Sequence, residues 1–363
     1  MSGISTHTCM LANALADGRH RTSALLMRKL IPRRLYPGRD RVGAQLTTLR
    51  YRNDVSVFDG VDYYWVPSII RAIRFLRRER PDVLLMQWWS GTVLHTFLLL
   101  AALARLSGAR VVIEFHETLD TAESAMPAFD RYVSTGSRPL IAMTSAAVVH
   151  STGDVDAVRQ RFPGLRNKPV VAVPMGPQEI TTDARRWQAE RPQHDGVFSL
   201  LYFGTIRPYK GLENLIRAFD ALTDEQAARF RLTVVGETWQ GWDLPATLIA
   251  ESPHRDRIDF VNTYVTDEQV AGYFRDADAV VLPYLRSSGS GPLHMAMSQG
   301  VPVAVTAVGG LIESVDGYSG ARLVRPDDVA DLTAALLDLP TMPGPHIDPH
   351  TWARTTTRIA ELF

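Results

Sequence analysis

The chain has 363 residues, 45% hydrophobic and 21% charged, a globular composition long enough for about two domains. Lys and Arg balance Asp and Glu at 39 each, so the bulk charge gives no electrostatic footprint for general nucleic-acid binding. The single cysteine, Cys9, excludes an intramolecular disulfide and a cysteine-rich metal site, and it fits a reducing, cytoplasmic location.

The chain opens on SGISTHTCMLANAL, which predicts a glycine loop entering a helix, with neither a secretory signal nor a strand before it. A sheet domain of the kind predicted below would open on a strand. Either translation starts at Met1, or the true start lies upstream; we expect the second.

Two basic stretches follow in the first half of the chain. They consist of Arg28, Lys29, Arg33, Arg34, Arg39 and Arg41, and of Arg71, Arg74, Arg77, Arg78 and Arg80. They are interpreted either as solvated loops and a helix face or as a surface that rests on anionic lipid headgroups. The most apolar run, Thr92–Leu106, is about 15 residues long and falls short of the ~20 that span a bilayer, so it predicts a buried helix.

Apolar strand-like segments alternate with helical patterns along the rest of the chain. In the first half the strands are predicted at 81–87, 109–117, 146–152 and 169–176. In the second half they are predicted at 199–204, 231–236, 257–262, 277–284, 301–307 and 321–326, with helices at 212–222, 266–277, 292–300 and 327–339. This alternation predicts an α/β fold with parallel sheets covered on both faces.

A polar stretch without regular pattern, 178–196, separates the two halves. We therefore predict an N-terminal Rossmann-like domain over 1–177, a linker over 178–197, a second Rossmann-like domain over 198–345 and a C-terminal helix over 346–363.

The loop after the first strand of the second half carries two cationic side chains. Gly204 ends the strand, and Arg207 and Lys210 follow before the next helix. Open α/β sheets bind ligands at this edge, where a helix N-terminus offers free N–H groups to an anion. Arg and Lys there suit a diphosphate, although two exposed basic residues on a loop would look the same.

A second loop, SSGSG, lies between a predicted strand and a helix that Pro292 helps to begin. Its residues Ser288, Gly289, Ser290 and Gly291 suit an anion cradle for phosphate or a sugar hydroxyl. The loop lacks the third glycine of a dinucleotide fingerprint, because His294 stands there. An ordinary strand–helix turn is the alternative.

The segment EFHE ends a strand of the first half and places His116 beside Glu117. A histidine with a pKa near neutrality could act as a general base, and Glu117 is a second candidate. A strand-end polar pair without a catalytic role is the alternative.

These motifs together resemble the retaining glycosyltransferases of family 4, which have the GT-B fold. The resemblance rests on FGTIRPYKGLENLIRAF, FVNTYVTDEQVAGYFRDADAVVLPY, SGSGPLHMAMSQGVPVAVTAVGGLIE and LVRPDDVADLTAAL, and it covers nearly all of 199–337. It implies two Rossmann-like domains facing across a cleft. It also implies hexose transfer from a nucleotide-diphosphate sugar, UDP- or GDP-linked, to a glycan, lipid or small-molecule acceptor, with retention.

The resemblance also implies roles for single residues. Arg207 and Lys210 would hold the donor diphosphate, and Gly3 would approach the donor phosphates closely. His116 would lie near the reacting sugar. Glu313, after Gly309 and Gly310, either contacts the donor or only begins a helix.

One departure from the family concerns a pair of glutamates that many members carry eight positions apart. Ser287 and Met295 stand at those positions, which fits a subgroup with a Ser/Gly-rich loop. The departure leaves the ribose contact and the choice of sugar open.

No metal or resident cofactor is predicted, because the sequence has no Asp-x-Asp at a strand end and no His/Cys cluster. The expected partners are the donor and a glycan or lipid-linked acceptor, with peripheral contact at the inner membrane face and no nucleic acid. Two alternatives remain: another GT-B enzyme, such as a phosphorylase or epimerase, and a non-catalytic relative that binds the donor or a partner.

Overall fold

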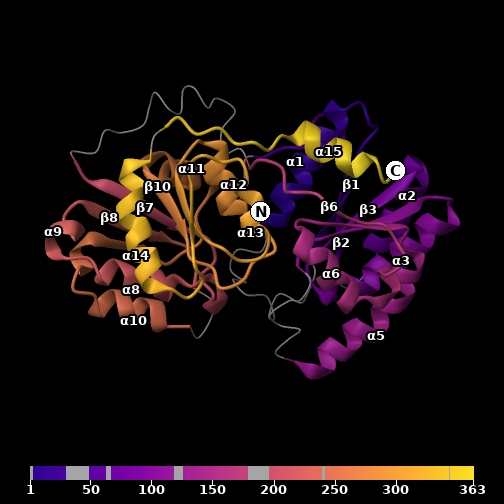
Figure 1. The fold of residues 1–363 in the computed structure, drawn as a ribbon. Coiled ribbons are helices and arrows are strands. Elements are labelled where there is room, and N and C mark those ends of the chain that lie inside the picture. The colour runs from indigo at the N-terminus through magenta and orange to yellow at the C-terminus, as the bar shows by residue number, and fades with distance from the viewer. Residues whose placement is uncertain are drawn as a thin grey trace. The chain divides into compact units, whose positions relative to one another are not determined.

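The computed structural model of the chain describes residues 3–29, 49–62, 67–117, 126–178, 196–238, 242–342 and 344–363. They form two compact units, each described by itself (Figure 1). Unit 1 comprises 1–45, 49–176 and 352–363, and unit 2 comprises 46–48 and 177–351. Most of the predicted linker, 179–195, lies outside the described residues. Parallel strands and helices in both units confirm the α/β class.

Unit 1 contains two parallel sheets, one with the order β1-β2 and one with the order β3-β4-β5-β6. Its elements are α1 Gly3–Asp17, β1 Ser23–Lys29, β2 Ser56–Asp62, α2 Ser68–Glu79, β3 Val83–Trp88, η3 Gly91–Val93, α3 Leu94–Leu106, β4 Arg110–Phe115, α5 Pro127–Met143, β5 Ala146–Val149, α6 Thr152–Arg161, η4 Pro163–Leu165, β6 Val170–Ala172 and α15 Trp352–Ala360.

The pleat of β4 and β5 divides the apolar side chains of unit 1 between two faces. Val111 and Ile113 pack with α3, α5 and α6 on one face, whereas Val112 packs with α1 and α15 on the other. Burial of both faces explains why these strands are nearly continuous apolar runs. The helix predicted over 92–106 is confirmed as η3 and α3, and the apolar side chains on its inner face are buried.

The C-terminal helix, predicted to stand alone, belongs to unit 1. Trp352 and Ile359 of α15 join the apolar cluster of α1. Gly176 lies so close to the ring of Trp352 that a Cβ at this position would overlap it. The last helix therefore covers part of the sheet face that α1 leaves open.

The first helix, α1, begins at the first described residue, Gly3, so the glycine predicted to lie in a loop is helical, and only Met1 and Ser2 before it lie outside the description. Cys9 is fully buried in α1, and burial raises the pKa of its thiol to about 11. A protonated, enclosed thiol is a packing residue and not a nucleophile.

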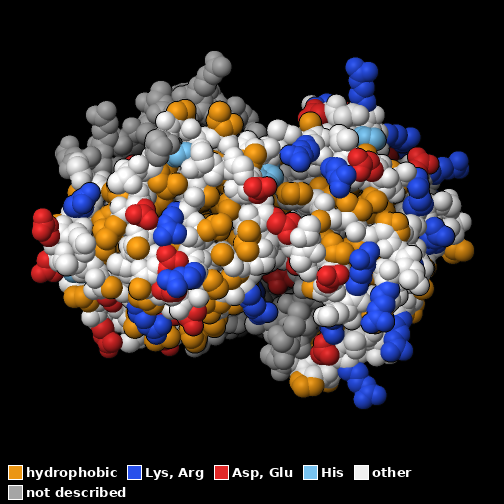
Figure 2. Space-filling view, in the orientation of Figure 1, with side chains coloured by type: hydrophobic (Ala, Val, Ile, Leu, Met, Phe, Trp, Pro, Cys, Tyr) orange, Lys and Arg blue, Asp and Glu red, His pale blue; other side chains and the backbone are white. Residues whose placement is uncertain are grey.

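The second basic stretch lies on an amphipathic helix, α2. Its inner face buries Ile69, Ala72, Phe75 and Leu76. Its five arginines are all exposed, and Ile70 among them is 47% exposed. The side chains of the first basic stretch, Arg28 to Arg41, lie outside the described residues. Figure 2 shows Lys and Arg outnumbering acidic side chains on the visible face of unit 1.

Unit 2 contains one parallel sheet of the order β12-β11-β10-β7-β8-β9. Its elements are β7 Phe198–Phe203, η5 Pro208–Lys210, α8 Leu212–Asp220, α9 Asp224–Ala227, β8 Phe230–Val235, α10 Leu244–Glu251, η6 Arg255–Arg257, β9 Ile258–Val261, α11 Asp267–Asp276, β10 Ala279–Leu282, α12 Gly291–Ser298, β11 Val303–Thr306, α13 Gly310–Ser314, β12 Ala321–Val324, α14 Val329–Asp338 and η7 Leu339–Thr341.

Helices cover both faces of this sheet, as the alternating pattern predicts (Figure 1). One face packs against α8, α10 and α14, and the other against α11, α12 and α13. Thr266 begins α11 with a complete capping box, in which its side chain and that of Gln269 satisfy each other's backbone N–H groups. The helix predicted over 266–277 is thus confirmed as α11, with Thr266 as its N-cap.

A search for membrane-crossing segments found none among the described helices: each is too short or too polar to reach across a bilayer.

Candidate functional site

The candidate donor site lies in unit 2, where the strand order changes direction. The chain leaves β7 toward β8 and β9 on one side, and toward β10, β11 and β12 on the other. In open parallel sheets, ligands bind outside the carboxyl ends of the strands at such a switch point. The two loops that the sequence singled out, after β7 and after β10, are the ones that meet there.

The loop after β7 is anchored to the loop after β10 by backbone contacts. Leu285 donates its N–H to the carbonyl of Tyr209 at 2.9 Å. Gly211, with φ of 63°, packs so closely against Pro283 that a Cβ would overlap its carbonyl oxygen. Arg207 and Lys210, both half-buried, are therefore held beside the second loop before any ligand arrives.

Tyr284 joins Lys210 to the start of α12. The Nζ of Lys210 lies 3.7 Å from the centroid of the Tyr284 ring. The hydroxyl of the same tyrosine lies 3.4 Å from Oγ of Ser290. Burial raises the pKa of Tyr284 to about 12, so its hydroxyl stays protonated. Tyr284 thus contacts both a cation and the N-terminus of a helix. These are the two features that favour the binding of an anion.

The SSGSG loop ends in a well-formed helix cap. Ser290 is the N-cap of α12, and its Oγ accepts the N–H of Leu293 at 3.3 Å. Gly291 is the first residue of α12 and Pro292 the second. The helix therefore begins one residue before Pro292, the start that the sequence predicts. Ser288, Gly289 and Gly291 are half-buried at the same edge. This geometry accommodates an anion cradle and also explains the loop as a capped turn.

A third loop, after β11, closes on the second. Gly310 donates its N–H to the carbonyl of Ser287 at 3.1 Å, and a Cβ at Gly309, where φ is 46°, would overlap that carbonyl. Glu313 lies half-buried in the short helix α13 that begins there. The helical position of Glu313 accounts for its presence, and its contact with a donor stays a prediction.

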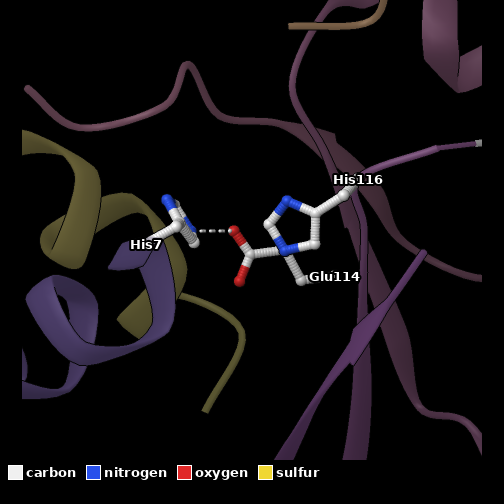
Figure 3. A group of neighbouring side chains, drawn as sticks. All are labelled: His7, Glu114 and His116. Carbon is white, nitrogen blue, oxygen red and sulfur yellow. Dashed lines mark hydrogen bonds and ion pairs between the residues drawn. The ribbon is translucent and has the colours of Figure 1, made fainter. Parts of the chain in front are cut away.

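The candidate acceptor site in unit 1 is a buried network of histidines around one carboxylate (Figure 3). His7 of α1 donates its Nε2–H to Oε1 of Glu114 at 3.0 Å. Gln87, opposite Glu114 in the register of β3 and β4, donates its amide to Oε2 at 2.7 Å. Nε2 of His116 lies 2.6 Å from the amide oxygen of Gln87, and Nδ1 lies 3.1 Å from Nε2 of His150.

Counting protons shows what this network lacks. Three contacts follow one another: Nδ1 of His150 with the carbonyl of Val173 at 3.2 Å, Nε2 of His150 with Nδ1 of His116, and Nε2 of His116 with the amide oxygen of Gln87. Each contact needs one ring N–H group, so the three together need three. Two neutral imidazoles provide two. With both rings neutral and Glu114 ionised, one of the three links therefore lacks its N–H group.

The pKa shifts agree with that count. Burial lowers the pKa of His116 well below its usual value, with help from its neighbour His150, and burial lowers the pKa of His150 as well. Burial alone would raise the pKa of Glu114. The electrostatic influence of the neighbouring histidines, His7 foremost, and the hydrogen bond from His7 outweigh burial, so the pKa of Glu114 falls and the carboxylate stays ionised. A neutral pair beside a fixed negative charge can serve as a general base.

The structure thus brings His116 into a network, with both ring nitrogens occupied within the protein. Glu117, half-buried, follows β4, and its role stays a prediction, as does that of Gly3 in α1. From the sequence, His7 is expected as a helix residue more than as a ligand, whereas Gln87 and His150 were not predicted. A signal for both existed, because Gln87 stands at the carboxyl end of β3 and His150 directly after β5, at the edge where His116 also lies.

A cavity of about 740 Å³ lies elsewhere in unit 2, around the first residues of β7 and β8 beside β9, where Ser199, Arg231 and Asp259 line it. It opens near the amino ends of these strands, whereas ligands of open parallel sheets bind at the carboxyl ends. We assign no function to it.

Comparisons with known proteins cover both units. The family model described as "Glycosyl transferase 4-like domain" matches residues 2–176, and that described as "Glycosyl transferases group 1" matches 197–341. A 2-deoxystreptamine glucosyltransferase of Streptomyces kanamyceticus is 24% identical over 311 residues, which cover 82% of this chain and 78% of that protein.

A GDP-mannose:glycolipid 4-beta-D-mannosyltransferase of Xanthomonas campestris is 30% identical over 209 residues, covering 55% of this chain and 58% of that protein. The solved structure of HepE from Anabaena in complex with UDP and glucose superimposes with a TM-score of 0.61 at 15% identity, covering 99% of this chain and 92% of that one.

The two sheet-based units and these matches define a glycosyltransferase with the two-domain GT-B fold. More particularly, its first half matches a glycosyl transferase 4-like domain and its second half a domain of the group 1 glycosyl transferases.

Proposed function

We propose that this glycosyltransferase moves a hexose from a UDP- or GDP-linked donor to a hydroxyl of a glycan, lipid-linked or small-molecule acceptor, with retention of configuration. The observation that carries the proposal is the position of Arg207 and Lys210 at the switch point, beside the capped N-terminus of α12. The departing diphosphate gains negative charge as the glycosidic bond breaks, and preorganised cations stabilise that charge.

The nucleotide is the first property to test. HepE was solved with UDP, and the Xanthomonas relative is named for GDP-mannose. Isothermal titration of the full chain with UDP, GDP and ADP would rank the bases. Binding of none of the three, in protein shown to be folded, would overturn the proposal.

For unit 1, we propose that Nε2 of His116 takes up the proton that the acceptor hydroxyl releases, with Glu114 stabilising the resulting imidazolium. Nε2 carries no proton when His116 donates from Nδ1 to His150 and His150 donates from Nδ1 to the carbonyl of Val173, so the acceptor hydroxyl would replace the Gln87 contact at this nitrogen. A transfer assay with labelled donor, followed by NMR analysis of the new anomeric centre, tests both transfer and retention.

We also propose that a lipid-linked acceptor would bring the exposed basic face of α2 to an anionic membrane surface. Residues 1–176 and 352–363 carry 25 Lys and Arg against 15 Asp and Glu, whereas 177–351 carry 14 against 24. The neutral overall charge therefore conceals a basic unit. Co-sedimentation with phosphatidylglycerol vesicles but not with phosphatidylcholine vesicles would support this contact, and its loss in Arg71→Glu/Arg74→Glu would locate it on α2.

A further inference from the structure

A second group of metal-ligating side chains lies in unit 2. His294 of α12, Asp348 and His350 each place one ligand atom within 4.8 Å of the other two. His294 is fully buried, and the side chains of Asp348 and His350 are 8% and 12% exposed. The rings of His294 and His350 meet edge to face, with centroids 5.1 Å apart. Two imidazoles and a carboxylate thus converge from segments more than fifty positions apart.

The carboxylate of Asp348 is only half satisfied. Its Oδ1 accepts the backbone N–H of His350 at 2.9 Å and lies 2.8 Å from Nδ1 of the same residue. Its Oδ2 is buried and has no hydrogen-bond partner among the described residues. A buried carboxylate oxygen without a partner is costly, and a bound cation would satisfy it.

The other group that could hold a metal, His7, Glu114 and His116, differs in this respect. There each oxygen of Glu114 accepts a hydrogen bond, and both nitrogens of His116 are engaged. A metal in unit 1 would have to displace those bonds. In the unit 2 group, by contrast, an oxygen of the carboxylate itself is left without a partner among the described residues.

We propose that His294, Asp348 and His350 bind one divalent transition-metal ion, with zinc as the ion to test. Two imidazoles and a carboxylate form a ligand set that zinc accepts, with a fourth position left for water. Binding through Nδ1 of His350 would replace the contact of that nitrogen with Oδ1 of Asp348, because one carboxylate cannot both hydrogen-bond Nδ1 and bind an ion held by Nε2 of the same ring. Ligand atoms of a tetrahedral zinc site lie roughly 3.3 Å apart, so those of this group, all within 4.8 Å of one another, would need only a local rearrangement on binding.

The site has a structural consequence within unit 2. His294 stands four positions after the N-cap Ser290, in the helix that begins at the candidate donor loop. Asp348 and His350 belong to the irregular segment that follows η7. A shared ion would fasten this segment to α12 and thereby stiffen the helix whose N-terminus faces the donor. The metal site itself does not depend on the proposed function.

The test uses the full chain without a polyhistidine tag, stripped of metal with a chelator and then dialysed against zinc. Elemental analysis should find one zinc ion per chain, with a rise in Tm over the stripped protein. Cobalt in place of zinc should give visible absorption bands of a four-coordinate site. Asp348→Asn and His350→Gln, which each remove a ligand, should weaken zinc binding by more than the roughly 10- to 100-fold that loss of a residue supporting a ligand costs.

Two control variants separate this site from its neighbours. His346→Gln removes a buried histidine of the same segment, whose Nδ1 lies 3.0 Å from Oγ of Ser319 instead. Glu114→Gln removes the carboxylate of the unit 1 group. Both should retain one zinc ion per chain. The proposal is overturned if the wild-type chain binds no zinc, or if Asp348→Asn and His350→Gln bind it as the wild type does.

Discussion

Lys210 rests its ammonium group on the ring of Tyr284, 3.7 Å from the ring centroid. The side chain is long and flexible, and without such a support it would lose conformational entropy on meeting a ligand. The aromatic face holds the charge at the switch point in advance, which reduces the cost of binding.

Removal of either cation should weaken nucleotide binding. A charge-assisted hydrogen bond contributes about 1.5–3 kcal/mol, so Lys210→Ala and Arg207→Ala should each raise the Kd for the preferred nucleoside diphosphate about 10- to 100-fold. Isothermal titration measures the change. Arg229→Ala, an exposed arginine just before β8, is the control and should bind normally. Unchanged affinity in both site variants would refute the assignment.

Two helix caps of the same kind should respond differently. Ser290→Ala and Thr266→Ala each remove an N-cap and should each lower the free energy of unfolding by about 1 kcal/mol. Only Ser290 lies at the candidate donor loop, so only Ser290→Ala should also weaken nucleotide binding. Equal nucleotide affinity in the two variants would show that the cap of α12 is structural alone.

A side chain at Gly211 should disturb the donor loop. Gly211→Ala forces a Cβ onto the Pro283 carbonyl at a positive φ, so we expect a loss of stability of about 1–3 kcal/mol together with weaker nucleotide binding. Gly272→Ala is the matched control. Nothing lies within 4 Å of its Cβ, and it sits inside α11, so it should stabilise the chain by about 0.5–1 kcal/mol. Thermal and urea unfolding check both.

The histidine network should make unit 1 sensitive to acid. The pKa values of His116 and His150 are lowered in the folded state. Below the unfolded value of about 6.5, the unfolded chain therefore binds more protons than the folded chain, and stability falls as the pH drops. Glu114, whose folded pKa is also lowered, adds to this loss when the pH falls below about 4.5.

His150→Asn should reduce the steepness of this loss. Each histidine contributes at most about 1.4 kcal/mol per pH unit between the unfolded and folded pKa values. Tm measured from pH 7.5 to 5 should thus fall less in the variant than in the wild type. His20→Gln, an exposed histidine, is the control. An identical pH dependence in wild type and His150→Asn would contradict the proposed protonation states.

The sequence predicted most of unit 2, because each of its strands is a short apolar run and its helices carry clear start signals such as Thr266. It did not predict β1 and β2, whose segments SALLMRK and SVFDGVD mix apolar and charged residues in a two-stranded sheet. It also missed α5, which contains Pro139 within the helix, a position where proline is normally excluded.

The site was predictable where chemistry follows a strand locally and unpredictable where it depends on distant packing. Arg207, Lys210 and His116 stand at strand ends and could be found from position alone. The hydrogen bond of His7 with Glu114 joins residues 107 positions apart. The approach of Asp348 to His294 likewise depends on the path of an irregular segment, which no periodicity encodes.

The placement of α15 makes unit 1 discontinuous in the chain. Trp352 lies against Gly176 and Ile359 completes an apolar cluster with Leu11, yet residues 177–351 are synthesised between them. Unit 1 therefore cannot finish folding on the ribosome until the last codons have been translated, while unit 2 already has its whole sheet. A fragment ending at Gly176 would leave that apolar face bare and should aggregate.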